Sequence, residues 1–155
     1  NGMKVLLPRL IDIDIQAVGG FLTPVFRVEE DDKQHDFNVS QISDGTLRIL
    51  GLLTALYHPN RPSVLALEEP EQTVNPGVLL ILADAIKEVS DKSQVLVTTH
   101  SPSFIDHFEP ESILAVGLGP NGTKVERVQG AQLEAEKRGL YSVRELMVKE
   151  GLGAA

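Results

Sequence analysis

The sequence predicts an α/β protein in which helices flank a parallel sheet, preceded by an N-terminal β-hairpin region. Two apolar runs, residues 64–67 and 95–97, each lead into polar residues and then into a helix start. Strands that alternate with helices in this way are typical of a parallel sheet covered on both faces. Residues 11–15 instead alternate apolar and acidic with a period of two, which indicates a half-buried strand.

Length and composition exclude several classes of protein. A chain of 155 residues is long enough for one domain with a core, so we expect a single domain over residues 1–155. It has no apolar run of about 18 residues, so no membrane span is expected. It has no cysteine, which excludes disulfides and thiolate metal sites and fits a cytoplasmic protein. The formal charge of −8 argues against a strongly basic nucleic-acid surface.

The first forty residues read as a hairpin region. The strand at 11–15 is followed by Gly19-Gly20, a turn signal, and residues 21–28 read as its partner strand. Residues 29–36 are all polar or charged and are predicted to form a solvated loop with no function.

After Ser43 the pattern changes to alternating helices and strands. The expected elements are a buried helix over 47–57, a strand over 64–68, a helix from Pro76 to about Val89, a strand over 94–99, a short helix from Pro102, strands over 112–116 and 124–128, and a C-terminal helix from Ser142. Asn75 and Ser101 each precede a proline, which predicts a capping side chain followed by proline at the first helical position. Leu79, Leu82, Ile86 and Val89 share one face of the 76–89 helix.

Polar residues follow both strands of the expected sheet. Glu68 and Glu69 end the strand over 64–68, and His100 follows the strand over 94–99. Ligands of open α/β sheets bind outside the carboxyl ends of the strands, so we expect these side chains to converge there. Paired carboxylates beside a core are costly unless a cation compensates them, and hard oxygen ligands suit Mg²⁺.

Three short motifs occur in a fixed order: Ser43-Asp44-Gly45-Thr46-Leu47-Arg48, Leu67-Glu68-Glu69-Pro70-Glu71 and Thr99-His100-Ser101-Pro102. In order and context they resemble the C-terminal half of an ABC-type ATPase domain, within the P-loop NTPase-like AAA ATPases related to the SMC, RecF and OLD proteins. The resemblance is close over about residues 40–108 and looser in the flanks.

The resemblance implies a role for each motif. Glu68 matches the Walker B acid, which supports Mg²⁺ directly or through water, and Glu69 matches the glutamate that polarises the attacking water. His100 matches the switch histidine that hydrogen-bonds the γ-phosphate of ATP. Ser43 and Gly45 match the signature motif, which contacts the γ-phosphate held by the opposing protomer, so the complete protein is expected to be a homodimer. Residues 71–76 match the D-loop along that dimer interface.

Each motif also has a plainer interpretation. Ser43 taken alone is a helix N-cap, since Ser-Asp-Gly is common at helix starts. The acidic residues after position 67 could be a charged turn before Pro76, and His100 could be a hydrogen-bonded core histidine. A helix N-terminus nevertheless offers free N–H groups to a phosphate, and glycine lets its backbone approach closely.

The sequence contains no G-x-x-x-x-G-K-[ST] loop, the element that cradles the phosphates. The chain is therefore expected to be the second half of an ATPase domain, whose partner is the missing N-terminal Walker A half. Alone it should bind ATP weakly or not at all and show no turnover. The alternative is a non-catalytic interaction module that keeps the fold. A metal-dependent nuclease would call for more acidic ligands than this spacing offers. A link to DNA follows from kinship only.

Overall fold

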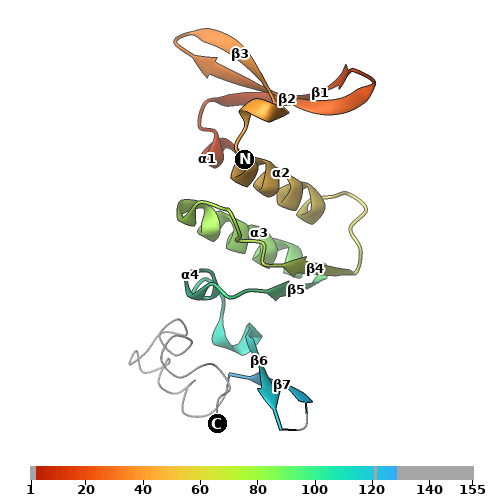
Figure 1. The fold of residues 1–155 in the computed structure, drawn as a ribbon, viewed down its shortest axis with the longest axis vertical. Coiled ribbons are helices and arrows are strands. Elements are labelled where there is room, and N and C mark those ends of the chain that lie inside the picture. Colours follow the sequence, from red (N-terminus) through yellow and green to blue (C-terminus); the bar gives the residue numbers. More distant parts are fainter. Residues whose placement is uncertain (1–2, 121, 129–155) are drawn as a thin grey trace. The chain divides into compact units, whose positions relative to one another are not determined.

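The computed structural model describes residues 3–120 and 122–128. The chain divides into two compact units, Asn1–Val97 and Thr98–Ala155. Figure 1 labels the main elements, and the full order is α1 (Met3–Leu6), β1 (Leu10–Val18), β2 (Phe21–Glu30), β3 (Lys33–Asn38), η1 (Val39–Gln41), α2 (Asp44–Leu56), β4 (Val64–Glu68), η2 (Pro76–Val78), α3 (Leu79–Ser90), β5 (Gln94–Thr98), α4 (Pro102–Ile105), η3 (Pro110–Ser112), β6 (Leu114–Gly119) and β7 (Gly122–Arg127). No helix in the described part of the chain has the length and apolar character needed to cross a membrane.

The first unit begins with an antiparallel sheet in the order β1-β2-β3. The predicted hairpin between β1 and β2 is confirmed, and its turn is Gly19-Gly20, both with positive φ. Glycine adopts this backbone conformation without steric cost. Phe26 in β2 is fully buried, whereas Phe21 and Leu22 beside the turn are largely exposed. Burial in this sheet is therefore centred away from the hairpin tip.

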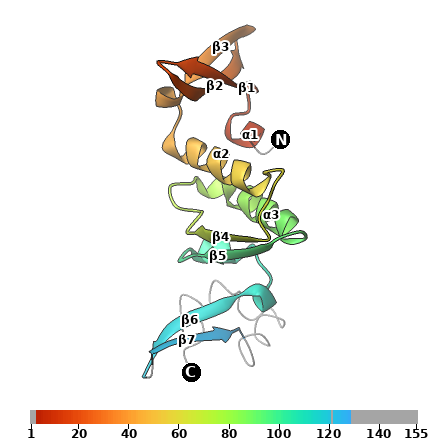
Figure 2. The same ribbon diagram turned by 90° about the vertical axis from the view of Figure 1, so that its right-hand side faces the viewer.

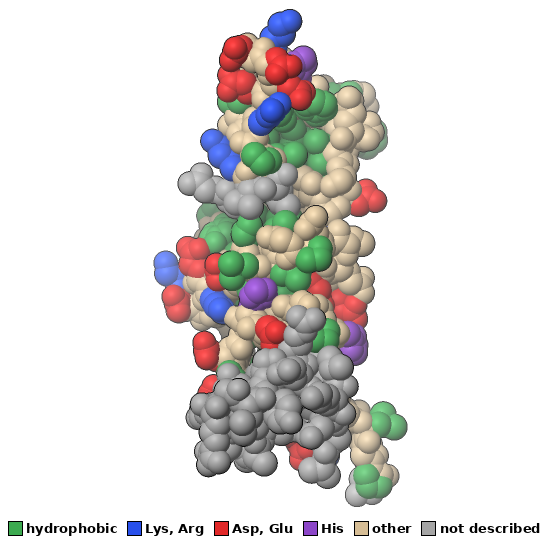
Figure 3. Space-filling model, turned by 90° about the vertical axis from the view of Figure 1, so that its left-hand side faces the viewer, with side chains coloured by type: hydrophobic (Ala, Val, Ile, Leu, Met, Phe, Trp, Pro, Cys, Tyr) green, Lys and Arg blue, Asp and Glu red, His purple; other side chains and the backbone are tan. Residues whose placement is uncertain are grey.

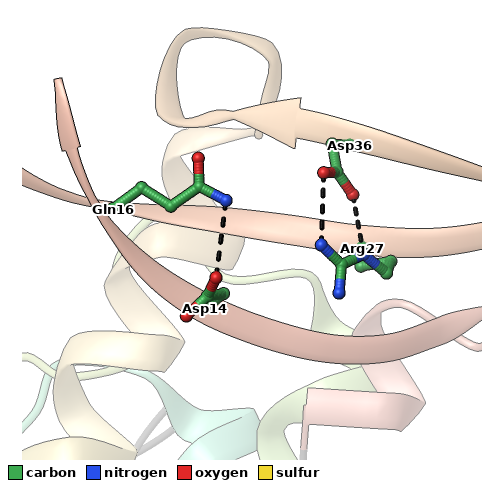
Figure 4. Close-up of polar contacts among 4 residues, drawn as sticks. All are labelled: Asp14, Gln16, Arg27 and Asp36. Atoms are coloured by element: carbon green, nitrogen blue, oxygen red, sulfur yellow. Dashed lines mark hydrogen bonds and ion pairs between the residues drawn. The ribbon is translucent and has the colours of Figure 1, made fainter.

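On the face of this sheet opposite Phe26, polar side chains contact one another (Figure 4). Arg27 donates from Nε to Asp36 Oδ1 at 3.0 Å, and Gln16 donates to Asp14 at 3.4 Å. The hydrogen bond to Asp36, and then its charge, raise the pKa of Arg27. These side chains are exposed or half-exposed, so the ion pair contributes little to stability.

The charged segment 29–36 is not a loop, and this prediction was wrong. Lys33–Asn38 forms β3, paired with β2 from Val25↔Asn38 to Glu30↔Lys33. Only Asp31 and Asp32 turn the chain, with φ of 49° and 57°, a conformation that aspartate tolerates. Acidic side chains gather around this turn (Figure 3), so a solvated edge strand was mistaken for a loop.

Next in the unit come α2 and α3, which pack against each other, with β4 beyond α3 (Figures 1 and 2). The β4 strand has the predicted bounds and forms a two-stranded sheet with β5. Gln94 N donates to Ser63 O at 2.8 Å, which joins the two strands at their starts, so they run in the same direction. The predicted parallel pairing is thus present.

The strands are less buried than predicted. Exposed and half-buried residues alternate along β4 and β5, and Val64 and Leu96 are about half exposed, at 48% and 50%. The expected full cover of the sheet is therefore wrong for the described residues. The helix predicted over 47–57 is α2, and of its residues Ile49 and Leu56 are buried. It is an amphipathic helix rather than a buried one.

The core of this unit lies largely on α3. The four residues predicted to share its inner face, Leu79, Leu82, Ile86 and Val89, are all buried. The hydroxyl of Tyr57, which follows α2, donates to Glu88 Oε2 of α3 at 2.5 Å. This hydrogen bond, and then burial, raise the pKa of Tyr57. The bond adds a polar tie between the two helices.

The second unit contains α4, η3 and the β6–β7 hairpin, with Ile105, Ile113 and Val128 in its core. The two predicted late strands are present, but β6 extends to Gly119 and β7 begins already at Gly122. Leu114, Val116, Leu118 and Val125 lie on one face of this hairpin and are exposed. The helix predicted from Ser142 lies outside the described residues.

Candidate functional site

A tight loop, residues 69–75, follows β4. Gln72 N donates to Glu69 O and Val74 N donates to Glu71 O, both at 3.1 Å, and Pro70 within the loop is fully buried. Glu69 and Thr73 have φ of 41° and 61°, in the left-handed region that non-glycine residues rarely adopt. Such conformations cluster at functional sites, where the surrounding structure maintains them. The loop is therefore a candidate functional site.

The two predicted acids stand at the carboxyl end of β4, as expected. Glu68 is the last residue of the strand and is exposed, whereas Glu69 is half-buried. The side-chain amide of Gln72 donates a hydrogen bond to Glu69 Oε2. The sequence placed Gln72 within the D-loop match at 71–76 but did not predict this contact, because a glutamine in a turn gives no signal of its own.

A magnesium ion would fit this strand end only in part. Among the described residues, no three His, Asp or Glu side chains come together in a way that could hold a metal ion. Mg²⁺ needs no such cage in nucleotide sites, because it retains water and binds one or two carboxylates together with the phosphates. The exposed carboxylate of Glu68 fits that pattern as a single protein ligand.

Ser43 is the N-cap of α2. Its Oγ accepts from Thr46 N at 3.2 Å and lies 2.8 Å from Thr46 Oγ1, and its φ and ψ are those of an extended residue. The plainer interpretation of Ser43 is therefore confirmed. Asp44, in the first turn of the helix, is exposed. A phosphate role for Ser43 would be additional to the cap.

Replacing Ser43 with alanine should lower the free energy of unfolding by about 1 kcal/mol, because the first turn of α2 loses its side-chain acceptor. Chemical denaturation of the chain measures this. Ser43→Asn, which retains a capping acceptor, is the matched control and should stay close to the parent. Equal stability of the alanine variant would contradict the capping role.

Gly45 is needed for a close backbone contact. A Cβ atom at this position would lie 2.6 Å from the carbonyl oxygen of Thr73 and 3.6 Å from its carbonyl carbon. Real Cβ atoms essentially never approach that closely. The predicted reason for this glycine was room for a phosphate; the contact present is with residue 73 of the acidic loop. The start of α2 is thus pressed against the loop after β4.

Arg48, one turn further along α2, makes a second contact with this loop. Its Nη2 donates to the carbonyl oxygen of Glu69 at 2.9 Å. Arg48 is the last residue of the Ser43–Arg48 motif, but the sequence predicts no function for it, since an arginine in an amphipathic helix usually lies on the solvent face. The two helix residues and the loop form one cluster in the first unit.

Asn75 closes the loop and starts the next helix as predicted. Its Oδ1 accepts from Gly77 N at 2.9 Å, and Pro76 occupies the first helical position. The first turn is η2, a 3-10 helix, and α3 follows it directly. The predicted cap is confirmed, while the D-loop role of residues 71–76 stays a prediction.

His100 belongs to the second unit, lies two residues after the end of β5 and is exposed. Thr99 Oγ1 accepts from Ser101 N at 2.9 Å, and Ser101 Oγ accepts from Phe104 N at 3.2 Å. The predicted Ser101 cap of α4 is therefore confirmed. These bonds on either side of His100 fix the backbone that carries it. Its expected approach to Glu68 and Glu69 stays a prediction.

Comparison with known proteins adds the family and the fold. A family model described as "AAA domain, putative AbiEii toxin, Type IV TA system" matches residues 5–106. No curated protein matches the chain significantly.

Two solved structures of SMC proteins resemble the chain. One, from work on the ATP-driven dimerization and DNA-stimulated activation of SMC ATPases, has a TM-score of 0.56 and 18% identity, over 90% of this chain and 86% of that one. The other, an SmcHead bound to the C-winged helix domain of ScpA, has a TM-score of 0.64 and 17% identity, over 87% of this chain. The chain spans only 41% of that second structure.

These comparisons confirm two of the expectations. The structural similarity confirms a P-loop NTPase-like α/β fold of the SMC head type, since identities this low carry the fold alone. The family model covers well over half of the chain, and its matched residues include all three motifs. The chain therefore belongs to the AAA-domain family with the description "AAA domain, putative AbiEii toxin, Type IV TA system".

Proposed function

We propose that this chain carries the acidic half of an ATP-hydrolysing site in a dimerising ABC-type ATPase, whose Walker A half is absent from these residues. One observation carries the proposal: the loop that presents Glu69 at the end of β4 is held against the first turns of α2 through Gly45 and Arg48. Two motifs that are more than twenty residues apart in sequence thus meet at one place. The AAA family and the SMC-like fold supply the reaction class.

Within this proposal each residue has a separate task. Glu69 accepts a proton from a water molecule that attacks the γ-phosphorus in line, and the bond to the leaving ADP oxygen breaks. Bound Mg²⁺, supported by Glu68, would neutralise charge on the phosphate oxygens. The first turn of α2, at Ser43 and Gly45, offers backbone N–H groups and a partial positive charge to a γ-phosphate held by the opposing protomer.

His100 completes the proposal as a donor to the γ-phosphate that senses its loss. The homodimer follows from a signature motif that acts across the interface, and ATP-driven dimerization is described for the similar SMC ATPase. DNA is named for that SMC protein only, and for this chain it stays a suggestion from kinship. A cytoplasmic location, which the absence of cysteine fits, belongs to the same proposal.

The test is to supply the upstream half of the domain and measure phosphate release from ATP. The expected result is hydrolysis that requires Mg²⁺ and ceases with EDTA, together with dimers that form with ATP and dissociate after hydrolysis. The chain alone should release no phosphate. If the complete protein, with an intact Walker A loop, neither binds nor hydrolyses ATP, the non-catalytic interaction module replaces the ATPase.

A further inference from the structure

Arg48 contacts the backbone of Glu69 from a different element. Its guanidinium is part-buried, and Nη2 lies 2.9 Å from the Glu69 carbonyl oxygen, which also accepts from Gln72 N at 3.1 Å. A carbonyl oxygen has two lone pairs, so these two donors together satisfy it. Arg48 thus fixes the first peptide unit of the loop as well as the turn that follows.

Packing alone does not explain an arginine here. Its Nε is buried and makes no hydrogen bond to the described residues. A buried donor without a partner is unfavourable, and an apolar side chain of similar length would fill the same space without that cost. The guanidinium is therefore better explained by its Nη2 atom, which donates a hydrogen bond to the Glu69 carbonyl oxygen.

The backbone that Arg48 binds is strained. Glu69 has φ of 41°, and a non-glycine residue keeps such a conformation only where its surroundings impose it. The left-handed backbone sets the direction in which the Glu69 side chain leaves the strand end. An interaction that holds this carbonyl therefore also determines where the carboxylate stands.

Arg48 does not act alone. It lies three residues after Gly45, so both face the same side of α2. Gly45 meets the carbonyl of Thr73, the second strained residue of the loop. One face of the helix start thus contacts the loop at both of its left-handed residues, and the two segments are held as one piece.

We propose that Arg48 is a positioning residue for Glu69, which couples the N-terminus of α2 to the carboxylate at the end of β4. Its consequence for catalysis rests on the proposed function, since only then does the position of Glu69 govern hydrolysis. A ligand that shifts the first turn of α2 would shift Glu69 through this contact. The contact itself exists independently of any ATPase activity.

The first experiment tests the contact in the full chain. Arg48→Met keeps the length of the stem and removes the donor. Amide hydrogen exchange at Gln72 and Val74 should accelerate about tenfold, because their turn loses its anchor. In Arg48→Lys, which can still donate a hydrogen bond, the exchange rates at Gln72 and Val74 should lie between those of the wild type and those of Arg48→Met. Exchange at Leu82 and Ala83 in α3 should not change. Arg9→Met, at an exposed arginine, is the matched control and should leave the loop unaffected.

Unchanged exchange at Gln72 and Val74 in a folded Arg48→Met variant would overturn the proposal. If the Arg48→Met variant does not fold, an NMR measurement on the wild-type chain tests the contact instead. A guanidinium held by the Glu69 carbonyl should give separate, slowly rotating Nη signals for Arg48 in the NMR spectrum. A single averaged Nη signal would equally overturn it.

The second experiment tests the catalytic consequence in the complete ATPase. Arg48→Met should lower kcat about tenfold to a hundredfold with KM for ATP unchanged, because Arg48 aligns Glu69 and does not touch the nucleotide. A change confined to KM would contradict the positioning role. If the wild-type complete protein itself hydrolyses no ATP, the proposed function fails, while the exchange result still decides whether Arg48 holds the loop.

Discussion

If the proposed function holds, replacing Glu69 with glutamine in the complete protein should lower kcat for ATP hydrolysis about 100- to 10,000-fold, the range over which a general base contributes. The amide retains the size of the side chain, and its oxygen can still accept from Gln72. What it loses is the capacity to take a proton from water. Steady-state phosphate release at saturating ATP measures the effect, and ATP-dependent dimers should persist because hydrolysis no longer separates them.

Glu88→Gln is the matched control for this substitution. Glu88 lies on α3, is exposed and accepts from the Tyr57 hydroxyl, a contact that the amide oxygen can keep. Its kcat should equal that of the parent. A Glu69→Gln variant that hydrolyses ATP at the parent rate would remove Glu69 from the mechanism. The same loss in both variants would point to general damage to the fold.

The second large effect concerns stability. Gly45→Ala should destabilise the chain by about 1–3 kcal/mol, the usual cost of forcing an extra carbon into a packed contact. The new Cβ would lie 2.6 Å from the Thr73 carbonyl oxygen, which is backbone and cannot rotate away. Either α2 must move out or the loop must shift, and Glu69 lies in that loop.

Gly51 provides an internal comparison, because it lies in the same helix and nothing lies within 4 Å of its Cβ position. Gly51→Ala should stabilise the chain by about 0.5–1 kcal/mol, since alanine is the better helix former. Urea denaturation of both variants measures the difference. If the two substitutions change stability in the same direction and by similar amounts, the close contact at Gly45 is contradicted.

Much of the local structure could be predicted, because its signals are local. A capping side chain before proline marked two helix starts, Asn75-Pro76 and Ser101-Pro102, and both are present. The apolar run before Glu68 gave the bounds of β4, and the period of α3 gave its buried face. In each case the residues that define the element are also neighbours in sequence.

The features that the sequence did not predict depend on contacts between residues far apart in the chain. Lys33–Asn38 consists mostly of polar residues, and only its pairing with β2 makes it a strand. The cover of β4 and β5 depends on what packs above them, which a strand's own residues do not specify. The roles of Gly45 and Arg48 depend on a loop more than twenty residues away. Tertiary contacts of this kind leave no periodic trace in the sequence.

The exposed apolar face of the β6–β7 hairpin affects the solubility of the isolated chain. Val116 and Leu118 are 67% and 95% exposed, and exposed apolar side chains that lie together favour association with further copies. The net charge of −8 opposes this by mutual repulsion, which added salt weakens. Stock solutions of this chain should therefore stay clear longest at low ionic strength and above the isoelectric point.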